Sequence, residues 1–249
     1  MIEVEGLRKV YPGQPPVVAV DEISFRARPG RIFGLLGPNG AGKTTTLRIL
    51  VTVLTKTSGS VRVEGVEVDE DPAAVRRSIG FVSASTGVYE RLTPPELLRY
   101  FGALQGLESA QVERRVAELV DMLDMGSFRD RFCGVLSTGQ KQKVSIARAL
   151  IHDPPVLIFD EPTSGLDVLV ARALVEQIET LREARRTIVL STHILHEAER
   201  LCDDVAIIHG GRICAQGTLA EVSGEAGLET AFFAAIDAAS AAQGEASSA

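Results

Sequence analysis

The 249-residue sequence lacks the features that mark membrane-spanning, secreted and nucleic-acid-coating proteins. It has no uninterrupted apolar run of about 18 residues, so we expect no transmembrane helix. Residues 1–5 lack the basic and apolar regions of a signal peptide, which predicts a cytoplasmic protein. The formal net charge of −7 argues against a broad nucleic-acid-binding surface, so no nucleic-acid partner is expected.

Cysteine is also scarce. Cys133, Cys202 and Cys214 are an odd number and have no C-x-x-C spacing. This pattern argues against a disulfide framework or a zinc site and predicts reduced thiols. The remaining composition, 45% hydrophobic and 24% charged, is ordinary for a globular protein. The length suits one large α/β domain or a core with an appended lobe.

A glycine-rich stretch stands out against this background. Residues 37–44, Gly-Pro-Asn-Gly-Ala-Gly-Lys-Thr, fit the pattern G-x-x-x-x-G-K-[ST] of phosphate-binding loops. The apolar run 31–36 before them predicts a buried strand. Apolar residues spaced for one helix face follow the loop, at Leu47, Leu50, Val51 and Leu54. The stretch is therefore expected at a strand-to-helix turn.

That turn has the chemistry to hold a nucleoside triphosphate. Glycines let successive N–H groups point inward, and a helix N-terminus adds its positive dipole end. Lys43 supplies a full charge for the β- and γ-phosphates, and the Thr44 hydroxyl suits Mg²⁺. The alternative, a glycine-rich turn with a chance lysine, is disfavoured because strand, helix and all fixed positions are present.

The rest of the chain predicts an α/β protein with two additions. Alternating residues at 2–11, with strand-like pieces at 17–20, 23–27 and 60–64, predict a small antiparallel sheet. Residues 93–125 read as two helices, the first opened by Thr93 as N-cap with Glu96 at the third position, and both belong to a helical insertion spanning about 88–150. Further elements are expected as buried strands at 156–159 and 187–191, helices at 168–184 and 196–202, and a hairpin at 205–215.

Two further motifs carry chemistry. Asp160 and Glu161 end the predicted strand 156–159, at the strand end where α/β folds place ligands. Asp160 suits Mg²⁺ and Glu161 suits the polarisation of an attacking water, although alone the pair could simply cap a strand. Ser137-x-x-Gln140 predicts a capping box that opens a helix. The N-terminus of that helix also favours an anion. From local physics alone, however, a helix cap with no further role is the favoured interpretation.

Five motifs in order resemble the ATP-binding subunit of an ABC transporter. They are Walker A at 37–45, the signature at 136–140, Walker B with a catalytic glutamate at 156–161, the D-loop at 164–167 and the switch histidine His193. The resemblance covers about residues 7–216. It implies an α/β P-loop NTPase with a RecA-like parallel sheet core, a small antiparallel subdomain and a helical subdomain carrying the signature. It divides the chain into an ABC ATP-binding domain at 1–222 and a C-terminal tail at 223–249, with one short helix and a partly disordered end.

The resemblance also assigns roles by position. Glu161 and His193 are expected to be catalytic, and Thr44 and Asp160 to hold Mg²⁺. The other expected sites are nucleotide binding by Tyr11, Gly37, Pro38, Asn39, Gly40, Ala41, Gly42, Lys43, Thr44, Thr45 and Asp160, a signature acting in trans at Leu136, Ser137, Thr138, Gly139 and Gln140, and a D-loop at Ser164, Gly165, Leu166 and Asp167.

The same resemblance implies partners. ATP and Mg²⁺ are the expected cofactors, and two ATPase subunits are expected to pair head to tail so that each signature closes over the other's ATP. A separately encoded membrane permease would hold the subunit at the inner face of the membrane. The wording of residues 136–143 and 152–155 resembles exporters of the sodium-extruding type.

One position departs from the family pattern, and two other classes of protein compete with the transporter assignment. The family usually has a glutamine after the strand resembling 79–82, linking Mg²⁺ to the membrane subunit, and Ala84 stands there instead. A soluble ABC ATPase of DNA repair or translation usually has two cassettes or a long coiled-coil insertion, whereas this chain has one cassette and a short insertion. A scaffold without hydrolysis would lack the acid at Glu161.

Overall fold

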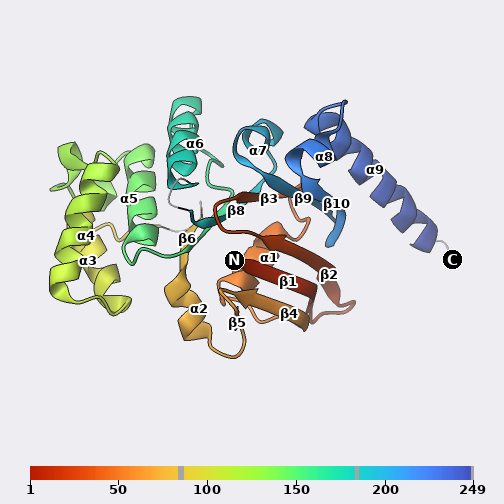
Figure 1. Ribbon diagram of the computed structural model, residues 1–249, viewed down its shortest axis with the longest axis horizontal. Helices are drawn as coiled ribbons and strands as arrows, with labels where there is room; N and C mark the ends of the chain where they lie inside the picture. The colour runs from red at the N-terminus through yellow and green to blue at the C-terminus, as the bar shows by residue number, and fades with distance from the viewer. Residues whose placement is uncertain (84–86, 183–184, 248–249) are drawn as a thin grey trace.

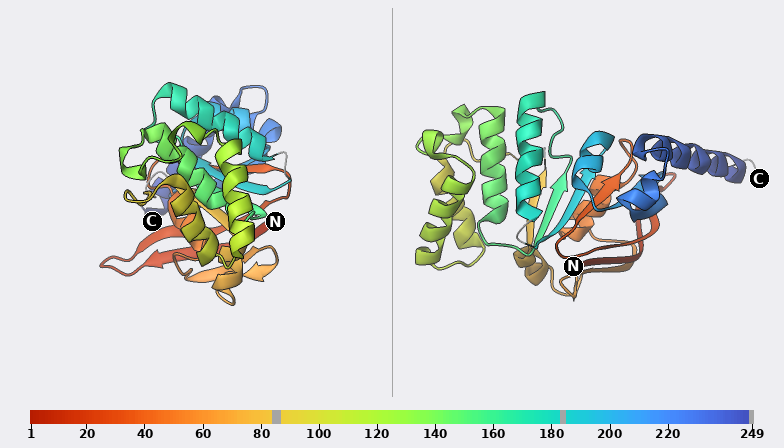
Figure 2. Two further views of the ribbon diagram at one scale, coloured as in Figure 1. Left: turned by 90° about the vertical axis from the view of Figure 1, so that its left-hand side faces the viewer. Right: turned by 45° about the horizontal axis from the view of Figure 1, so that its top comes forward.

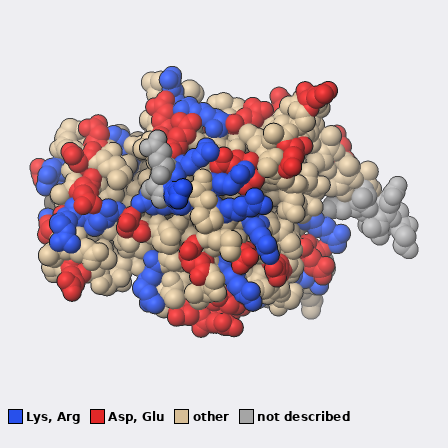
Figure 3. Space-filling model, viewed as in Figure 1, with Lys and Arg blue, Asp and Glu red and all other residues tan. Residues whose placement is uncertain are grey.

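The computed structural model describes residues 1–83, 87–182 and 185–247. Two sheets form its centre, with helices at one end and a long C-terminal helix projecting from the other (Figures 1 and 2). Basic and acidic side chains are interleaved over the face seen in Figure 3. No helix in the described part of the chain is long and apolar enough to cross a membrane.

The larger sheet has six strands, five of them parallel and one antiparallel at an edge. Three of its inner strands are buried along their whole length, as expected for parallel strands covered on both faces. This confirms the predicted parallel core. The strands in order across the sheet are β10 (Arg212–Thr218), β9 (Asp204–His209), β3 (Ile32–Leu36), β8 (Thr187–Thr192), β7 (Val156–Asp160) and β6 (Ile79–Ser83).

The smaller sheet is antiparallel, as predicted. The two expected pieces at 17–20 and 23–27 form a single strand. An irregularity lies between them, where Glu22 adopts a φ of 54°, and this break in the alternation explains the split prediction. The strands in order are β2 (Val17–Ala27), β1 (Ile2–Tyr11), β4 (Ser58–Val63) and β5 (Val66–Glu67).

Alternate side chains of the parallel strands enter two different cores. Val156 and Ile158 of β7 pack in the core shared with the antiparallel sheet, whereas Leu157 and Phe159 pack in the opposite core. The first core contains helix α1 (Lys43–Leu50). The second contains the helices of the insertion together with α6 (Val168–Arg182) and α7 (Leu195–Leu201).

The helical insertion forms one end of the molecule (Figure 1). Both predicted capping boxes are present, with Thr93 and Glu96 before one helix and Ser137 and Gln140 before another. A Cβ at Gly102 would lie 2.9 Å from Val112, so this glycine lets the first two helices approach closely. The helices are α3 (Pro94–Leu104), α4 (Ser109–Met122) and α5 (Thr138–Leu150), with 3₁₀ turns at Gly126–Phe128 and Cys133–Val135.

Three further helices complete the fold. A short helix α2 (Pro72–Ser78) precedes β6, and α8 (Leu219–Ser223) follows β10. The helix α9 (Leu228–Ser247) corrects the prediction of one short tail helix, because it runs for 20 residues. Leu228 and Phe232 anchor it in the core. Its alanine-rich continuation has high helix propensity without apolar periodicity, so periodicity alone could not reveal its length.

The cysteines are free thiols, as predicted. Burial raises the pKa of Cys202 to about 12, with the nearby Asp203 carboxylate acting in the same direction. A Cβ at Gly34 of β3 would lie 2.6 Å from the Cys202 sulfur, so a glycine is needed there for close packing. Cys202 is therefore a packing residue.

Candidate functional site

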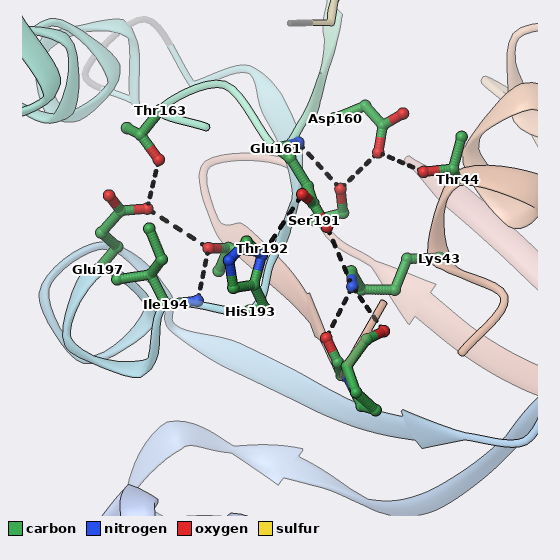
Figure 4. Close-up of polar contacts among 12 residues, drawn as sticks. Lys43, Thr44, Asp160, Glu161, Thr163, Ser191, Thr192, His193, Ile194 and Glu197 are labelled. Carbon is green, nitrogen blue, oxygen red and sulfur yellow. Dashed lines mark hydrogen bonds and ion pairs between the residues drawn. The ribbon is translucent and has the colours of Figure 1, made fainter. Parts of the chain in front are cut away.

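The candidate site lies at the carboxyl ends of three neighbouring strands, β3, β8 and β7 (Figure 4). The phosphate loop follows β3, His193 follows β8, and Asp160 ends β7 with Glu161 directly after it. The parallel register pairs Asp160 with Ser191 and Leu36 with Thr192, so the three strand ends are level. The topology thus brings together three motifs that are far apart in the sequence.

The phosphate loop has the strand-to-helix geometry that its sequence predicts. Gly40 and Gly42 have φ values of 80° and 110°, which L side chains rarely adopt. A Cβ at Gly42 would also lie 2.5 Å from the Ala19 carbonyl oxygen of β2. Together with Glu161, the loop surrounds a cavity of about 240 Å³. The lining residues are Ala19, Asn39, Gly40, Ala41, Gly42, Lys43, Thr44, Thr45 and Glu161.

Lys43 folds back over this loop and is only 3% exposed. Its Nζ donates hydrogen bonds to the carbonyl oxygens of Gly37 at 2.6 Å and Pro38 at 3.0 Å. The same Nζ lies 3.1 Å from Glu161 Oε1. A cation suited to phosphate and a carboxylate suited to general-base work therefore share one side of the cavity.

Asp160 joins the loop to β8. Its Oδ1 accepts hydrogen bonds from Thr44 Oγ1 at 3.1 Å and from Ser191 Oγ at 2.7 Å. A carboxylate and a hydroxyl are the hard oxygen donors that Mg²⁺ prefers, usually alongside water and phosphate oxygens. The Thr44 and Asp160 oxygens therefore fit Mg²⁺. Among the described residues no cluster of three His, Cys, Asp or Glu exists that could hold a metal without such help.

Glu161 is held in an unusual backbone conformation. Its φ is 47°, the left-handed region that non-glycine residues seldom occupy. Its N–H donates to both the carbonyl oxygen and the hydroxyl of Ser191, each at 3.1 Å. His193 Nδ1 lies 3.4 Å from Glu161 Oε2 (Figure 4). The strained conformation thus directs the Glu161 side chain between Lys43 and His193.

Ser191 is a site residue that the sequence reasoning missed. It is fully buried and bonds both Asp160 and Glu161. A polar residue at the carboxyl end of an apolar strand was the available signal. Using that signal required the order of the strands, which local patterns do not give.

The signature residues lie elsewhere in the chain. None of residues 136–140 lines the phosphate-loop cavity. Ser137 caps α5, where its hydroxyl accepts from the Gln140 N–H and Gln140 Oε1 accepts from the Ser137 N–H. Gly139 faces Val170 of α6, and a Cβ there would lie 3.2 Å from that side chain. The chain therefore does not bring its own signature to its own phosphate loop.

The D-loop residues 164–167 connect Glu161 to α6. Gly165 has a φ of 75°, and the Asp167 carboxylate caps α6 by accepting from the N–H groups of Leu169 and Val170. Val168 and Leu169 are strongly exposed apolar residues directly after the loop. This stretch is thus a turn followed by two exposed apolar side chains.

Tyr11 lies at the end of β1, half-buried and paired with Val17 of β2. Lys9 Nζ is 5.0 Å from the centre of its ring. The cavity lining includes Ala19 from that same strand β2, and Tyr11 is not part of the lining. Its predicted stacking on adenine stays a prediction. Ala84, where the family glutamine is expected, lies outside the described residues.

Comparison with known proteins decides the family. The family model described as ABC transporter matches residues 20–164, which contain the phosphate loop, the signature and the Asp160–Glu161 pair. This chain belongs to the ABC transporter family. It is 41% identical over 204 residues to the ABC transporter ATP-binding protein NatA of Bacillus subtilis, covering 82% of this chain and 83% of that protein.

Other members extend the match along the chain. The Daunorubicin/doxorubicin resistance ATP-binding protein DrrA of Streptomyces peucetius is 38% identical over 244 residues, 98% of this chain and 73% of that protein. A solved structure described as the ATP-binding subunit of an ABC transporter superposes with a TM-score of 0.83 at 34% identity, covering 94% and 99% of the two chains. This ABC subunit is therefore an ATP-binding protein and an ATPase, as the sequence predicted.

Proposed function

We propose that this ATPase subunit powers an ABC exporter by ATP-driven head-to-tail dimerisation. One observation carries the proposal. Lys43 and Glu161 line one cavity, and Asp160 and His193 contact its lining residues Thr44 and Glu161, while none of the signature residues 136–140 lines it. A second subunit can supply the missing signature. Solved members of this fold include a dimeric post-hydrolysis cassette bound to ADP and Pi, with a TM-score of 0.79 at 24% identity.

The geometry suggests what each of these residues does. Lys43 binds the β- and γ-phosphates, with the N–H groups of the loop surrounding them. Thr44 and Asp160 would hold Mg²⁺, which would supply positive charge to the phosphate oxygens. Glu161 accepts a proton from the attacking water. His193, 3.4 Å from the Glu161 carboxylate, contacts the γ-phosphate and orients Glu161.

The partner's signature supplies an anion site. A capping box satisfies the N–H at the third helical position, which is Gln140 here. The N–H groups at the first two positions, Thr138 and Gly139, have no partner within the helix. In the proposed dimer these two groups bind the γ-phosphate held by the other subunit. The D-loop tip around Val168 and Leu169 lies in the same interface.

A separately encoded membrane permease is the proposed transport partner. A cavity of about 420 Å³ lies beside the strand that precedes Ala84, the position linked to the membrane subunit in this family. Apolar residues such as Val51 and Phe101 line it, and Arg148 adds a cation. We propose that the permease docks here and holds the subunit at the inner face of the membrane.

The direction of transport follows the names of relatives. Besides the resistance protein DrrA, a Nod factor export ATP-binding protein of Cupriavidus metallidurans is 39% identical over 217 residues, 87% of this chain and 71% of that protein. Exporters among the relatives support export here. Co-expression with a candidate permease, followed by ATP-dependent transport into inverted vesicles, tests the direction, because an exporter fills inverted vesicles and an importer does not.

A mixed-dimer experiment tests the shared site. Lys43→Ala and Ser137→Arg are each expected to be inactive. In a mixed dimer one site carries both changes, while the other combines an intact Lys43 with an intact Ser137. Random pairing makes about half of the dimers mixed, so mixing should recover part of the hydrolysis.

A second readout removes the dependence on turnover. The same mixture on a Glu161→Gln background should form dimers when ATP is added, detected by light scattering. If Lys43 and Ser137 acted within one chain, every site in the mixture would carry a change. Neither hydrolysis nor dimer formation would then return, and the head-to-tail arrangement would be wrong.

A further inference from the structure

A buried carboxylate on α7 connects two loops of the site (Figure 4). Glu197 is 4% exposed, and its Oε2 accepts hydrogen bonds from Thr163 Oγ1 at 3.0 Å and Thr192 Oγ1 at 3.4 Å. Thr163 follows Glu161 by two residues, and Thr192 directly precedes His193. One carboxylate oxygen thus joins the segment after β7 to the end of β8.

The placement of Glu197 is not explained by helix capping. It occupies the third position of α7, where a capping-box glutamate would accept from the N-cap N–H. That N–H, on Ile194, donates instead to Thr192 Oγ1 at 3.0 Å. Glu197 therefore points away from its own helix end and toward the two threonines.

The burial of the Glu197 carboxylate is energetically costly. A buried carboxylate loses its hydration and normally has a cation beside it. No Lys, Arg or His among the described residues forms an ion pair with Glu197. Among the described residues, the hydrogen bonds to its carboxylate come from the two threonine hydroxyls. Such networks are rigid when fully bonded.

Contacts on both sides of Glu161 hold its strained backbone. Before Glu161, the Ser191 carbonyl and hydroxyl hold its N–H. After it, Thr163 is tied through Glu197 to Thr192. Since the Glu161 φ of 47° is unfavourable, the segment needs support on both sides to keep it.

We infer that Glu197 is a positioning residue for hydrolysis. It holds Thr163 and Thr192 at a fixed separation, and thereby keeps the Glu161 carboxylate in register with His193. Because Thr163 leads directly into the D-loop, the same tie transmits a shift of His193 to residues 164–167. This role rests on the proposed catalytic roles of Glu161 and His193.

The central test separates turnover from binding. In the full-length chain, Glu197→Ala should lower kcat about 10-fold or more, since a small misplacement of a catalytic group is costly. The KM for ATP should stay within about twofold, because the phosphate loop is untouched. Glu197→Gln should recover most of the rate, since its amide oxygen can accept from both threonines.

Matched variants test the two ties. Thr163→Val should lower kcat in the same direction and add little to Glu197→Ala, because both changes break one interaction. Thr163→Ser should behave as the wild type. Glu179→Ala is the control, since it breaks the exposed Glu179–Arg200 pair between α6 and α7 and leaves the site alone.

The outcomes distinguish this inference from the proposed function. Wild-type kcat in Glu197→Ala, or fully multiplicative effects of Glu197→Ala and Thr163→Val, would overturn the positioning role. Near-normal hydrolysis in Glu161→Gln would overturn the assigned base itself. Should Glu197→Ala not fold, Thr163→Val decides the matter, because it removes one hydroxyl and keeps the carboxylate.

Discussion

Helices α1 and α5 both begin at a motif suited to phosphate, but their N-termini are built differently. Helix α1 begins after Gly42, which has no side chain to cap it. Helix α5 begins after Ser137, whose hydroxyl and partner Gln140 form a complete capping box. The first N-terminus is left open beside Lys43, and the second is satisfied locally.

In the proposed dimer, this difference suits the two N-termini of one chain to two different sites. The open N-terminus of α1 favours an anion, and in the proposed function a phosphate bound beside Lys43 supplies it. The capped N-terminus of α5 is stable on its own and keeps only the N–H groups of Thr138 and Gly139 for a later contact. Helix α5 is therefore stable in a monomer, before the proposed dimer forms.

The largest expected effect comes from a change at the open N-terminus of α1. Lys43→Ala removes the buried cation that faces the phosphates, so ATP affinity should fall about 100-fold, which corresponds to about 3 kcal/mol for a charged hydrogen-bonding group. Titration with a fluorescent ATP analogue measures this. Arg172→Ala, which removes a surface cation from α6, should leave the affinity unchanged. Equal affinities for wild type and Lys43→Ala would contradict the assigned phosphate site.

The next effect separates chemistry from binding at the open end. Glu161→Gln should reduce hydrolysis about 10²–10⁴-fold, since an amide cannot accept the proton of the attacking water. ATP binding should persist, so the variant should accumulate as an ATP-bound dimer in size-exclusion chromatography. Glu176→Gln, on the exposed face of α6, serves as the control. Turnover close to that of the wild type would exclude Glu161 as the base.

A smaller effect tests the capped end. Ser137→Ala and Thr93→Ala each remove the first residue of a capping box, so each should lower the free energy of unfolding by about 1 kcal/mol. Only Ser137→Ala should also weaken ATP-dependent dimerisation, because α3 has no role in the shared site. Chemical denaturation and light scattering provide the two measurements. If both variants dimerised equally well with ATP, Ser137 would act only as a helix cap and not in the shared site.

The smallest effect concerns the other end of α5. His152, which follows α5, bonds the Ile79 carbonyl oxygen of β6 through Nε2, while its buried Nδ1 has no partner among the described residues. Burial lowers the His152 pKa below its usual value, against smaller opposing contributions from the Ile79 carbonyl and Asp153. The unfolded chain therefore takes up the proton more readily than the folded chain.

The sign of the pH dependence follows. This contribution to stability is present above the ordinary histidine pKa of about 6.5 and is lost as pH falls through the lower folded value. The melting temperature should drop between pH 7.5 and pH 5.5, and the drop should be smaller in His152→Gln. Nucleotide affinity depends on α1, so it should be the same in the wild type and in His152→Gln. If the melting temperature fell equally in the wild type and in His152→Gln, the titration would not belong to His152.

The sequence predicted the local features well because their causes are local. The phosphate loop, its flanking strand and helix, and both capping boxes follow from residues within one or two turns. The partners across the sheet were not predictable in this way. Ser191 reaches Asp160 and Glu161 only because β8 lies between β3 and β7, and Glu197 reaches Thr163 for the same reason.

Helix α2 and the full length of α9 were not predicted, for two other reasons. Helix α2 has Asp71 as N-cap and Pro72 at its first position, a signal present in the sequence, but the helix is only seven residues long. So short a segment shows too few periods of apolar spacing to stand out. The extension of α9 beyond Ile236 has the opposite cause, since high alanine propensity maintains a helix that no packing pattern marks.

The phosphate loop is braced by distant parts of the chain, and this has a consequence for biosynthesis. Gly211, in the turn between β9 and β10, donates its N–H to the Ala41 carbonyl, and a Cβ at Gly37 would lie 2.3 Å from the Ile208 carbonyl oxygen. The loop leaves the ribosome well before residues 208–211 do. A nascent chain therefore acquires these two contacts to the phosphate loop only after residue 211 has been made.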